Sequence, residues 1–517
     1  MKYLNIFKKI SIILLILFSI PAIFYLFQPG YFQSDDGNWM VIRFSAFYES
    51  LRNGQFPVRF LSRLNNGYGY PVSNFLYPLF MYIGVPIHIL GASFVDTIKV
   101  ILGTSLIFSA VFCFLWLRKR FDYFASFVGS LLYLYFPYHL WDVYKRGSVG
   151  EVLALAIVPF ILWSIEKQNL ILAGIGYGLL ITSHNSLALL FLPIIFLYHI
   201  LSSPKINKKV FLKILSPLIL GLGLGAFFWI PAIYDKQFTI FDSVSVSNYS
   251  DYFVSLSNYN LLGFIFILVL VLSLTPFYKR RNKVDIYFLS ITVVSLFLII
   301  PFSEFLWRNL PFVALIQFPF RFLSLITLSI AFLSASQLSH FKNKAKIIIG
   351  IIYLLAIFFS AKDFLKPQNF ENYPDSYYST NQDTTTVKNE YMPRWIRQVP
   401  AKMPEKKIEI ISGEGEISNF STNGNKFIFN FFSNKESQIQ INTVYFPGWM
   451  LEINRRSVPI IYDENGLIRF NVSSGNHHVE VKFSETRIRF LSDVISIISL
   501  LFIIFLLISK KKYLIKL

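Results

Sequence analysis

The chain has 517 residues, of which 54% are hydrophobic and 18% aromatic, and its mean hydropathy is +0.52. A water-soluble protein could not keep so much apolar surface out of water, so the composition excludes a soluble globular protein and indicates an integral membrane protein. The formal net charge of +19 does not indicate nucleic-acid binding, because lysine and arginine cluster in short segments between apolar runs, as in cytoplasmic membrane loops.

The N-terminal segment 1–27 resembles a signal peptide, with a basic start and an apolar stretch. The stretch is long, however, and has no small-x-small cleavage site, which favours a retained first span. The one cysteine, Cys113, lies in an apolar run, so no intrachain disulfide can form.

Basic residues predict the orientation of the spans, because cytoplasmic loops are enriched in lysine and arginine. The N-terminal lysines place the start of the chain in the cytoplasm, and the same rule places the later basic clusters there. These clusters are Arg118-Lys119-Arg120, Lys205 with Lys208-Lys209 and Lys213, Lys279-Arg280-Arg281 with Lys283, Lys342 with Lys344 and Lys346, and Lys510-Lys511-Lys512.

This orientation requires that the apolar stretch 75–90 does not cross the membrane. Pro78, Gly84 and Pro86 make it a poor straight helix, so we expect an interfacial or re-entrant segment on the outer face. This orientation predicts a multi-pass plasma-membrane protein with about twelve transmembrane helices and with both termini in the cytoplasm. The predicted spans are 10–27, 98–117, 121–139, 149–165, 170–184, 186–201, 211–231, 259–278, 284–301, 319–338, 346–362 and 489–509.

The long polar stretch between the last two spans predicts a small extracytoplasmic domain. From about Lys407 it alternates apolar and polar residues, with Asn-Gly and Ser-Gly-Asn turns, as in an antiparallel β-sandwich or barrel. The predicted organisation is therefore a membrane domain over 1–362, with the first outer loop at 28–97. The predicted organisation continues with an extracytoplasmic linker and β-rich domain over 363–487. It ends with a last span and a basic tail over 488–517.

The first outer loop is a candidate reactive site. Asp35 and Asp36 lie about eight residues beyond the first span, and arginines that include Arg43 and Arg59 follow them. Arginine binds phosphate oxygens through a fork of donors, and a carboxylate can take a proton from a hydroxyl, so the pattern suits a reaction on a phosphate-bearing lipid. The alternative is a solvated loop whose charges pair with one another or with lipid head groups.

Other outer loops also contain polar residues at span ends. Asp142 and Arg146 precede Glu151, a carboxylate at the start of a span, which is either functional or a helix cap. The pair His184-Asn185 is either functional or a tight polar turn between spans. Gln317 and Arg321 begin another span, where Arg321 is either a phosphate ligand or an interfacial anchor.

Several motifs together resemble a known family. They are "RNGQFPVRF", "NGYGYPVSNFLYPL", "YKRGSVGEVLALAIVPF", "SHNSLALL", "QFPFRFL", "NEYMP" and "YFPGWMLEINRRSVPI". The chain resembles the bacterial 6-pyruvoyl-tetrahydropterin-synthase-related membrane proteins and the YfhO-type family. Both resemble GT-C-type glycosyltransferases, which use polyprenyl-phosphate-linked sugars. The resemblance covers nearly the whole chain.

The resemblance implies roles for individual residues. The acidic catalytic residue of the first outer loop corresponds to Asp35 or Asp36, and a following arginine corresponds to Arg43. An Arg-Gly…Glu element matches Arg146 and Glu151, and a His-Asn pair matches His184 and Asn185. The outer-loop residues described above and this resemblance together predict substrate binding at Arg43, Arg59, Asp142, Arg146, Glu151, His184, Asn185, Gln317 and Arg321. The chain departs from its relatives at Asn38-Trp39, where they often have a histidine, and this puts a proton relay there in doubt.

The expected function is transfer of a sugar from a polyprenyl-phosphate donor to an extracytoplasmic glycan, lipid or protein acceptor in envelope assembly. The expected partners are membrane lipid, donor and acceptor, and no nucleic acid. No cofactor is required, no metal ligands are assigned, and the use of a divalent cation is left open. The alternatives are an inactive envelope-assembly scaffold and a flippase for a lipid-linked glycan. A flippase predicts polar residues at mid-membrane, whereas here they gather at the outer span ends.

Overall fold

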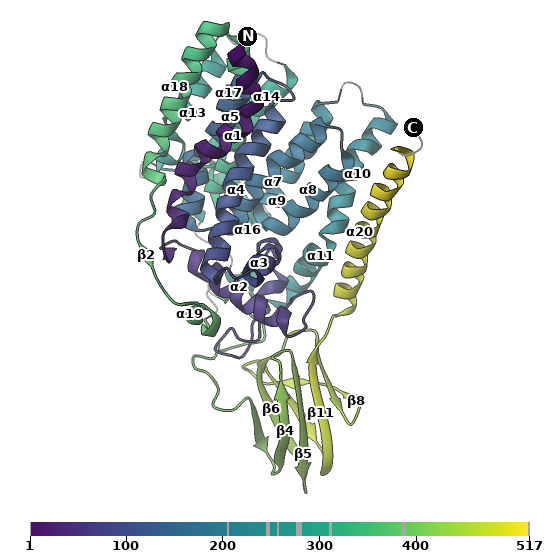
Figure 1. Cartoon of the computed structure of the whole chain (residues 1–517). Coiled ribbons are helices and arrows are strands. Elements are labelled where there is room, and N and C mark those ends of the chain that lie inside the picture. The colour runs from purple at the N-terminus through teal and green to yellow at the C-terminus, as the bar shows by residue number, and fades with distance from the viewer. Residues whose placement is uncertain are drawn as a thin grey trace. The chain divides into compact units, whose positions relative to one another are not determined.

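The computed structural model describes residues 2–203, 206–244, 249–255, 258–275, 282–309, 313–383 and 389–514. It is mostly helical, with a β-sheet domain in its C-terminal part (Figure 1). Contacts divide the chain into two compact units. The first comprises Met1–Met40, Tyr82–Gly225 and Val246–Tyr373, and the second comprises Val41–Met81, Ala226–Ser245 and Pro374–Leu517.

The first unit is a bundle of helices. They are α1 (Lys2–Ile23), α4 (Phe94–Leu117), α5 (Tyr123–Tyr135), α6 (Pro137–Trp141), α7 (Val149–Glu166), α8 (Leu170–Ser183), α9 (Asn185–Leu201), α10 (Lys208–Leu224), α13 (Gly263–Leu274), α14 (Lys283–Leu298), α15 (Glu304–Asn309), α16 (Val313–Ile316), α17 (Leu323–His340) and α18 (Asn343–Ala361). Strands β1 (Tyr31–Phe32) and β2 (Phe370–Glu371) pair antiparallel in the same unit. Helices α2 (Gly37–Arg52) and α3 (Leu79–Ile89) run across the boundary between the units.

Six helical segments in the described part of the chain are long and apolar enough to cross a membrane. The number rises to eight if each of two pairs of consecutive helices is counted as one span. The six are Lys9–Phe27, Phe94–Leu117, Val149–Glu166, Pro319–His340, Asn343–Phe364 and Arg487–Ser509. A helix lies at each of the twelve predicted spans, but four of these helices outside those two pairs, α5, α8, α9 and α13, have only 12–17 residues. The number of crossings therefore stays a prediction.

Two predicted spans are interrupted. Within 121–139, helix α5 ends at Tyr135, because the residue before Pro137 is extended (φ −57°, ψ 130°), as steric clash with a proline ring favours. Within 211–231, α10 ends at Leu224 and Gly225 follows it. The predicted interfacial stretch contains α3, whose 11 residues are too few for a crossing.

Helices α8 and α10 lie side by side with their backbones in close approach (Figure 1). A Cβ added to Gly221 of α10 would lie 2.2 Å from the Cβ of Tyr177 and 2.9 Å from the amide nitrogen of Gly178. Gly174 and Gly178 of α8 have the small-xxx-small spacing that allows such packing between membrane helices. This contact holds α8, and with it the junction between α8 and α9, in place.

The second unit contains the predicted β-rich domain, which the structure confirms. Its helices are α11 (Ala226–Asp235), α12 (Phe241–Val244), α19 (Asp375–Thr380) and α20 (Arg487–Leu514). Its strands are β3 (Ile408–Ser412), β4 (Glu416–Thr422), β5 (Lys426–Ser433), β6 (Ser437–Val444), β7 (Trp449–Ile453), β8 (Arg456–Val458), β9 (Ile461–Tyr462), β10 (Leu467–Val472) and β11 (Gly475–Phe483). They form a sheet of order β3-β6-β10-β9 and a sheet of order β4-β5-β11-β7-β8.

The alternation that predicted the strands places their apolar residues in one shared core. Along β5, Phe427, Phe429 and Phe431 are buried, and Val481 and Val479 of β11 lie opposite the first two. Residues of the other sheet, including Ile439 and Phe470, belong to the same core, as does Phe60 from the first loop.

The two units differ from the predicted division, which followed chain order. The unit that contains the β-sheets also contains 41–81 and α11, because α11 packs on α20 and Phe60 packs in the β-domain core. Lys205 and Lys279-Arg280-Arg281, used above to orient the spans, lie outside the described residues.

Candidate functional site

Four segments of the first unit surround one carboxylate, Glu151. It is the third residue of α7, and a π-helical turn, Asp142–Arg146, lies just before that helix. His184 forms the N-terminal cap of α9, where its Nδ1 accepts a hydrogen bond from the Leu187 amide at 3.2 Å. The fourth segment is the short 3₁₀ turn Pro319–Phe322, which leads into α17.

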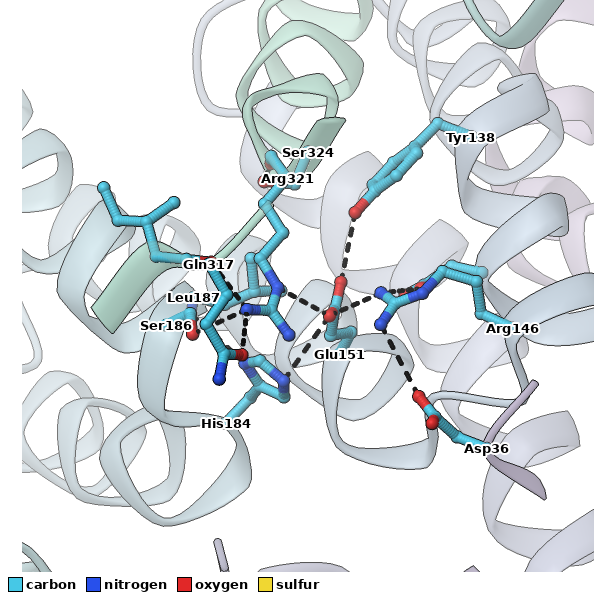
Figure 2. A network of polar contacts seen from close by, with 12 residues as sticks. Asp36, Tyr138, Arg146, Glu151, His184, Ser186, Leu187, Gln317, Arg321 and Ser324 are labelled. Carbon is cyan, nitrogen blue, oxygen red and sulfur yellow. Dashed lines mark hydrogen bonds and ion pairs between the residues drawn. The ribbon is translucent and has the colours of Figure 1, made fainter. Parts of the chain in front are cut away.

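Glu151 accepts hydrogen bonds through both carboxylate oxygens (Figure 2). Its Oε1 accepts from Arg146 Nη1 at 2.6 Å and from Arg321 Nε at 2.9 Å, and His184 Nε2 lies 3.5 Å away. Its Oε2 accepts from the hydroxyl of Tyr138 at 3.0 Å. Two guanidinium groups on opposite sides therefore share one carboxylate oxygen.

Each arginine has further partners. Arg321 Nη1 donates to Ser186 Oγ at 3.0 Å, to the carbonyl of Ile316 at 2.6 Å and to Gln317 Oε1 at 2.9 Å. Arg146 Nη1 also lies 3.1 Å from Asp142 Oδ1. Aromatic rings pack over both cations: Phe318 over Arg321, and Trp141, Phe318 and Phe320 over Arg146.

The charges in this cluster are buried. The side chains of Asp142 and Glu151 have no exposed area, and those of Arg146, His184 and Arg321 are at most 6% exposed. Buried charges need partners in good geometry, and here two guanidinium groups face two carboxyl groups. We call Asp142, Arg146, Glu151, His184 and Arg321 the Glu151 cluster.

Asp142 differs from Glu151 in its surroundings. Burial raises the pKa of Asp142 well above its usual range, and the nearby Glu151 raises it further. Its Oδ2 has no hydrogen-bond partner in the described structure. Both effects act against the charged form of Asp142.

Asp35 and Asp36 lie at the exposed end of the cluster. Their amides donate to the carbonyls of Lys145 (2.9 Å) and Arg146 (2.8 Å). Asp36 Oδ2 is 3.5 Å from Arg146 Nη2, and Asp35 Oδ1 is 3.4 Å from Lys145 Nζ. The side chains of Asp36 and Asp35 are 41% and 52% exposed, so these carboxylates can contact a ligand in solvent.

Gly147 makes this close approach of the chains feasible. Its φ of +66° is in the left-handed region that glycine adopts freely. A Cβ there would lie 2.5 Å from Ser34 Oγ and 2.8 Å from the Gly37 amide nitrogen. Glycine at 147 therefore allows the backbone of Lys145 and Arg146 to lie against the backbone of the two aspartates. Beside them, Asn38 donates to Glu371 Oε2 at 3.1 Å.

The structure thus brings seven of the candidate residues into one connected group: Asp36, Asp142, Arg146, Glu151, His184, Gln317 and Arg321. Asp35 joins at its edge through Lys145. Asn185 is the exposed first residue of α9. Glu151 lies in the first turn of α7 and His184 caps α9, as the structural alternatives expect. Both side chains also belong to the Glu151 cluster, and a functional role for them stays a prediction.

Arg43 and Arg59 lie in the second unit. Arg43 is a buried residue of α2. Arg59 is also buried, and its guanidinium contacts Glu485 at 3.2 Å, Asp493 at 2.8 Å and the carbonyl of Phe227 at 2.6 Å. These internal partners account for the buried charge of Arg59 without a ligand.

Three residues of the site were not predicted: Tyr138, Lys145 and Ser186. Lys145 was overlooked although it adjoins Arg146 in the motif "YKRG", and Ser186 although it follows His184-Asn185. The only sequence signal for Tyr138 is that it is an aromatic residue near a predicted span end. Within the described residues, no group of three or more histidine, cysteine, aspartate or glutamate side chains has an arrangement that could hold a metal ion.

Known proteins give two kinds of match. Among the solved structures, the arabinofuranosyltransferase AftD from Mycobacteria is similar over 73% of this chain, at 14% identity and a TM-score of 0.49. The archaeal oligosaccharyltransferase AglB from Archaeoglobus fulgidus, in complex with an inhibitory peptide and a dolichol-phosphate, is similar over 73% of the chain, at 13% identity and a TM-score of 0.43. The chain spans only 28% and 57% of the lengths of these two proteins.

No curated protein matches the chain. A family model does: the 6-pyruvoyl-tetrahydropterin synthase related domain, described as a membrane protein, matches residues 74–365. The matched region is more than half of the chain and contains the π-helical turn, Glu151, His184 and Arg321. The chain therefore belongs to the 6-pyruvoyl-tetrahydropterin synthase related family of membrane proteins.

Proposed function

We propose that the protein is a membrane glycosyltransferase that transfers a sugar from a polyprenyl-phosphate donor to an extracytoplasmic acceptor in cell-envelope assembly. The observation that supports this most is the pair of half-exposed carboxylates, of which Asp36 contacts the buried Arg146 and Asp35 contacts the neighbouring Lys145. Such a group offers a proton acceptor next to fixed positive charge, which is what attack on a phosphate-linked sugar requires. The motif "YKRGSVGEVLALAIVPF" contains Arg146, and the resemblance to GT-C-type enzymes implies that the catalytic acid is Asp35 or Asp36.

In the proposed reaction, Asp36 is the general base. Its carboxylate accepts the proton of an acceptor hydroxyl while that oxygen attacks the anomeric carbon of the donor. The new carbon–oxygen bond forms as the bond from the anomeric carbon to the phosphate oxygen breaks, and the polyprenyl phosphate leaves with the electron pair. Attack opposite the leaving group inverts the anomeric centre. Asp36 is preferred to Asp35 because it contacts Arg146.

Glu151 has a positioning role in this proposal. It holds Arg146 and Arg321 in fixed directions, so that neither cation must reorganise when negative charge develops on the leaving phosphate. The side chains of Tyr138, Ser186 and Gln317 hold Glu151 or Arg321 in turn. No resident cofactor enters this scheme, and a divalent cation stays open.

The proposal includes the predicted topology. The protein would lie in the plasma membrane with both termini in the cytoplasm, so that the aspartates and the β-domain face outward. The donor would then enter laterally from the outer leaflet, and the β-domain would hold or select the glycan, lipid or protein acceptor.

The first experiment compares binding of the purified full-length protein to synthetic polyprenyl-phosphate sugars and to the same lipids without phosphate. We expect phosphate-dependent binding, followed by sugar transfer in an acceptor screen that the double variant Asp35→Asn/Asp36→Asn abolishes while it stays folded. Full transfer by that double variant would refute the assignment of the base. A folded protein with no phosphate preference would support the scaffold alternative instead.

A further inference from the structure

The exposed end of the Glu151 cluster contains two ion pairs of matching geometry. Lys145 Nζ faces Asp35 at 3.4 Å and Arg146 Nη2 faces Asp36 at 3.5 Å, and the backbones of the two dipeptides are hydrogen-bonded alongside. Two adjacent cations therefore face two adjacent carboxylates along one short stretch.

These ion pairs are looser than the buried ones. Charge-assisted N–H···O bonds are typically about 2.7–2.9 Å long, which the Arg321–Glu151 contact at 2.9 Å satisfies and the two outer pairs do not. The side chain of Lys145 is 46% exposed, like those of the two aspartates. Lys145 and Asp35 form an exposed ion pair, which contributes little to stability, so Asp35 can leave its cation at low cost. Asp36 is 41% exposed and faces the buried Arg146 at the longer distance of 3.5 Å.

Arg146 is fixed even when Asp36 leaves. Its Nη1 remains between Glu151 and Asp142, so that Nη2 keeps its direction toward the exposed side. An external anion that replaces the aspartates would meet two cations already in place.

We propose that Lys145 and Arg146 form a phosphate-binding subsite, which Asp35 and Asp36 occupy in the ligand-free protein and vacate when a lipid-linked phosphate binds. This inference rests on the proposed function and names its donor subsite. A donor phosphodiester, with one negative charge, replaces the Asp36 carboxylate. The product monoester, with a charge of about −1.5 to −2, replaces both. The exchange keeps the total negative charge beside Lys145 and Arg146 nearly constant. It also frees Asp36 to accept the proton that the acceptor hydroxyl releases during sugar transfer.

The exchange is tested by binding of a synthetic polyprenyl phosphate to the full-length protein in nanodiscs. Loss of one charged partner by Lys145→Gln should weaken binding about tenfold or more. Removal of the competing carboxylate by Asp35→Asn should instead strengthen it, by up to about fivefold. Lys362→Gln alters another exposed lysine of the same unit and should change nothing. Lys145→Arg keeps the charge and should restore most of the affinity, which separates charge loss from misfolding.

Two further ligands identify the occupant. The corresponding polyprenol, which lacks phosphate, should bind with the same affinity to wild type and to Lys145→Gln. Inorganic phosphate should compete only weakly; equally strong competition would assign the subsite to free phosphate and overturn a lipid occupant. Equal binding by the Lys145→Gln and Lys362→Gln proteins, or weaker binding by Asp35→Asn, would overturn the exchange.

Sugar transfer separates this inference from the proposed function. If polyprenyl phosphate binds with the expected pattern and no transfer occurs with any acceptor, the subsite stands and the glycosyltransferase proposal fails. If transfer occurs and Lys145→Gln leaves the KM for the donor unchanged, the proposed function stands and the subsite is wrong.

Discussion

Replacing Glu151 by glutamine tests whether one buried carboxylate holds the site together. The change preserves size and one acceptor oxygen but removes the charge that Arg146 and Arg321 share at 2.6 and 2.9 Å. Breaking a buried ion pair by removing one partner costs about 3–5 kcal/mol, because the remaining charge is buried without compensation. Asp142 still contacts Arg146, but its raised pKa limits the negative charge that it supplies. We therefore expect Glu151→Gln to lower the free energy of unfolding by about 3–5 kcal/mol.

The measurement is reversible unfolding of the full-length protein in mixed micelles, with Glu304→Gln as the matched control. Glu304 is in the same unit and pairs with Arg308 at 2.8 Å, but at side-chain exposures of 36% and 67%. An exposed pair of this kind contributes about 0–1 kcal/mol. If Glu151→Gln destabilises the protein no more than Glu304→Gln does, Glu151 does not compensate the buried arginines and the reasoning is wrong.

Three further predictions concern other parts of the fold. Gly221→Ala should destabilise the protein by about 1–3 kcal/mol, because its Cβ would overlap the backbone of α8. Gly103→Ala, whose Cβ would meet a leucine methyl at 3.3 Å and an isoleucine methyl at 3.9 Å but no backbone atom, should be nearly neutral in the same unfolding assay. Gly147→Ala should cost about 1–3 kcal/mol for a left-handed residue and reduce donor affinity; unchanged donor affinity would refute the role of the close approach. Burial lowers the pKa of Lys407 to about 7, whereas the unfolded chain keeps that proton to about pH 10.4. Stability relative to Lys407→Met should therefore rise, on the order of 2–4 kcal/mol, between pH 7 and 10 and be constant below pH 7.

The helical positions and the β-domain could be predicted because each depends on local pattern. Apolar runs predict helices wherever they occur, and alternation along 426–431 predicts a strand with phenylalanines on one face, which the core confirms. Local apolar patterns do not predict two other features of the fold. These are the helix break before Pro137 and the grouping of 41–81 with the C-terminal segment. The first was missed because hydropathy does not register backbone geometry, and the second because it depends on tertiary packing.

The candidate site was predictable residue by residue but not as an arrangement. Polar residues at apolar span ends identified Asp36, Arg146, Glu151, His184 and Arg321 individually. That Arg321 and Arg146 share one oxygen of Glu151 depends on a contact between residues 170 positions apart, which no local pattern encodes. For the same reason, no local pattern shows that the guanidinium of Arg59, a candidate for substrate binding, contacts two internal carboxylates.

The sequence positions of the partners of Arg59 also determine when the second unit can fold during synthesis. Glu485 and Asp493 lie 426 and 434 residues later in the chain. At a synthesis rate of about 5–20 residues per second, the ribosome needs about 20–90 s to reach them. During that interval, Arg59 has been synthesised and its two carboxylates have not. The second unit therefore cannot close until synthesis is nearly complete, so truncation of the chain before α20 should expose the nascent protein to quality-control proteases even though most of its helices are already made.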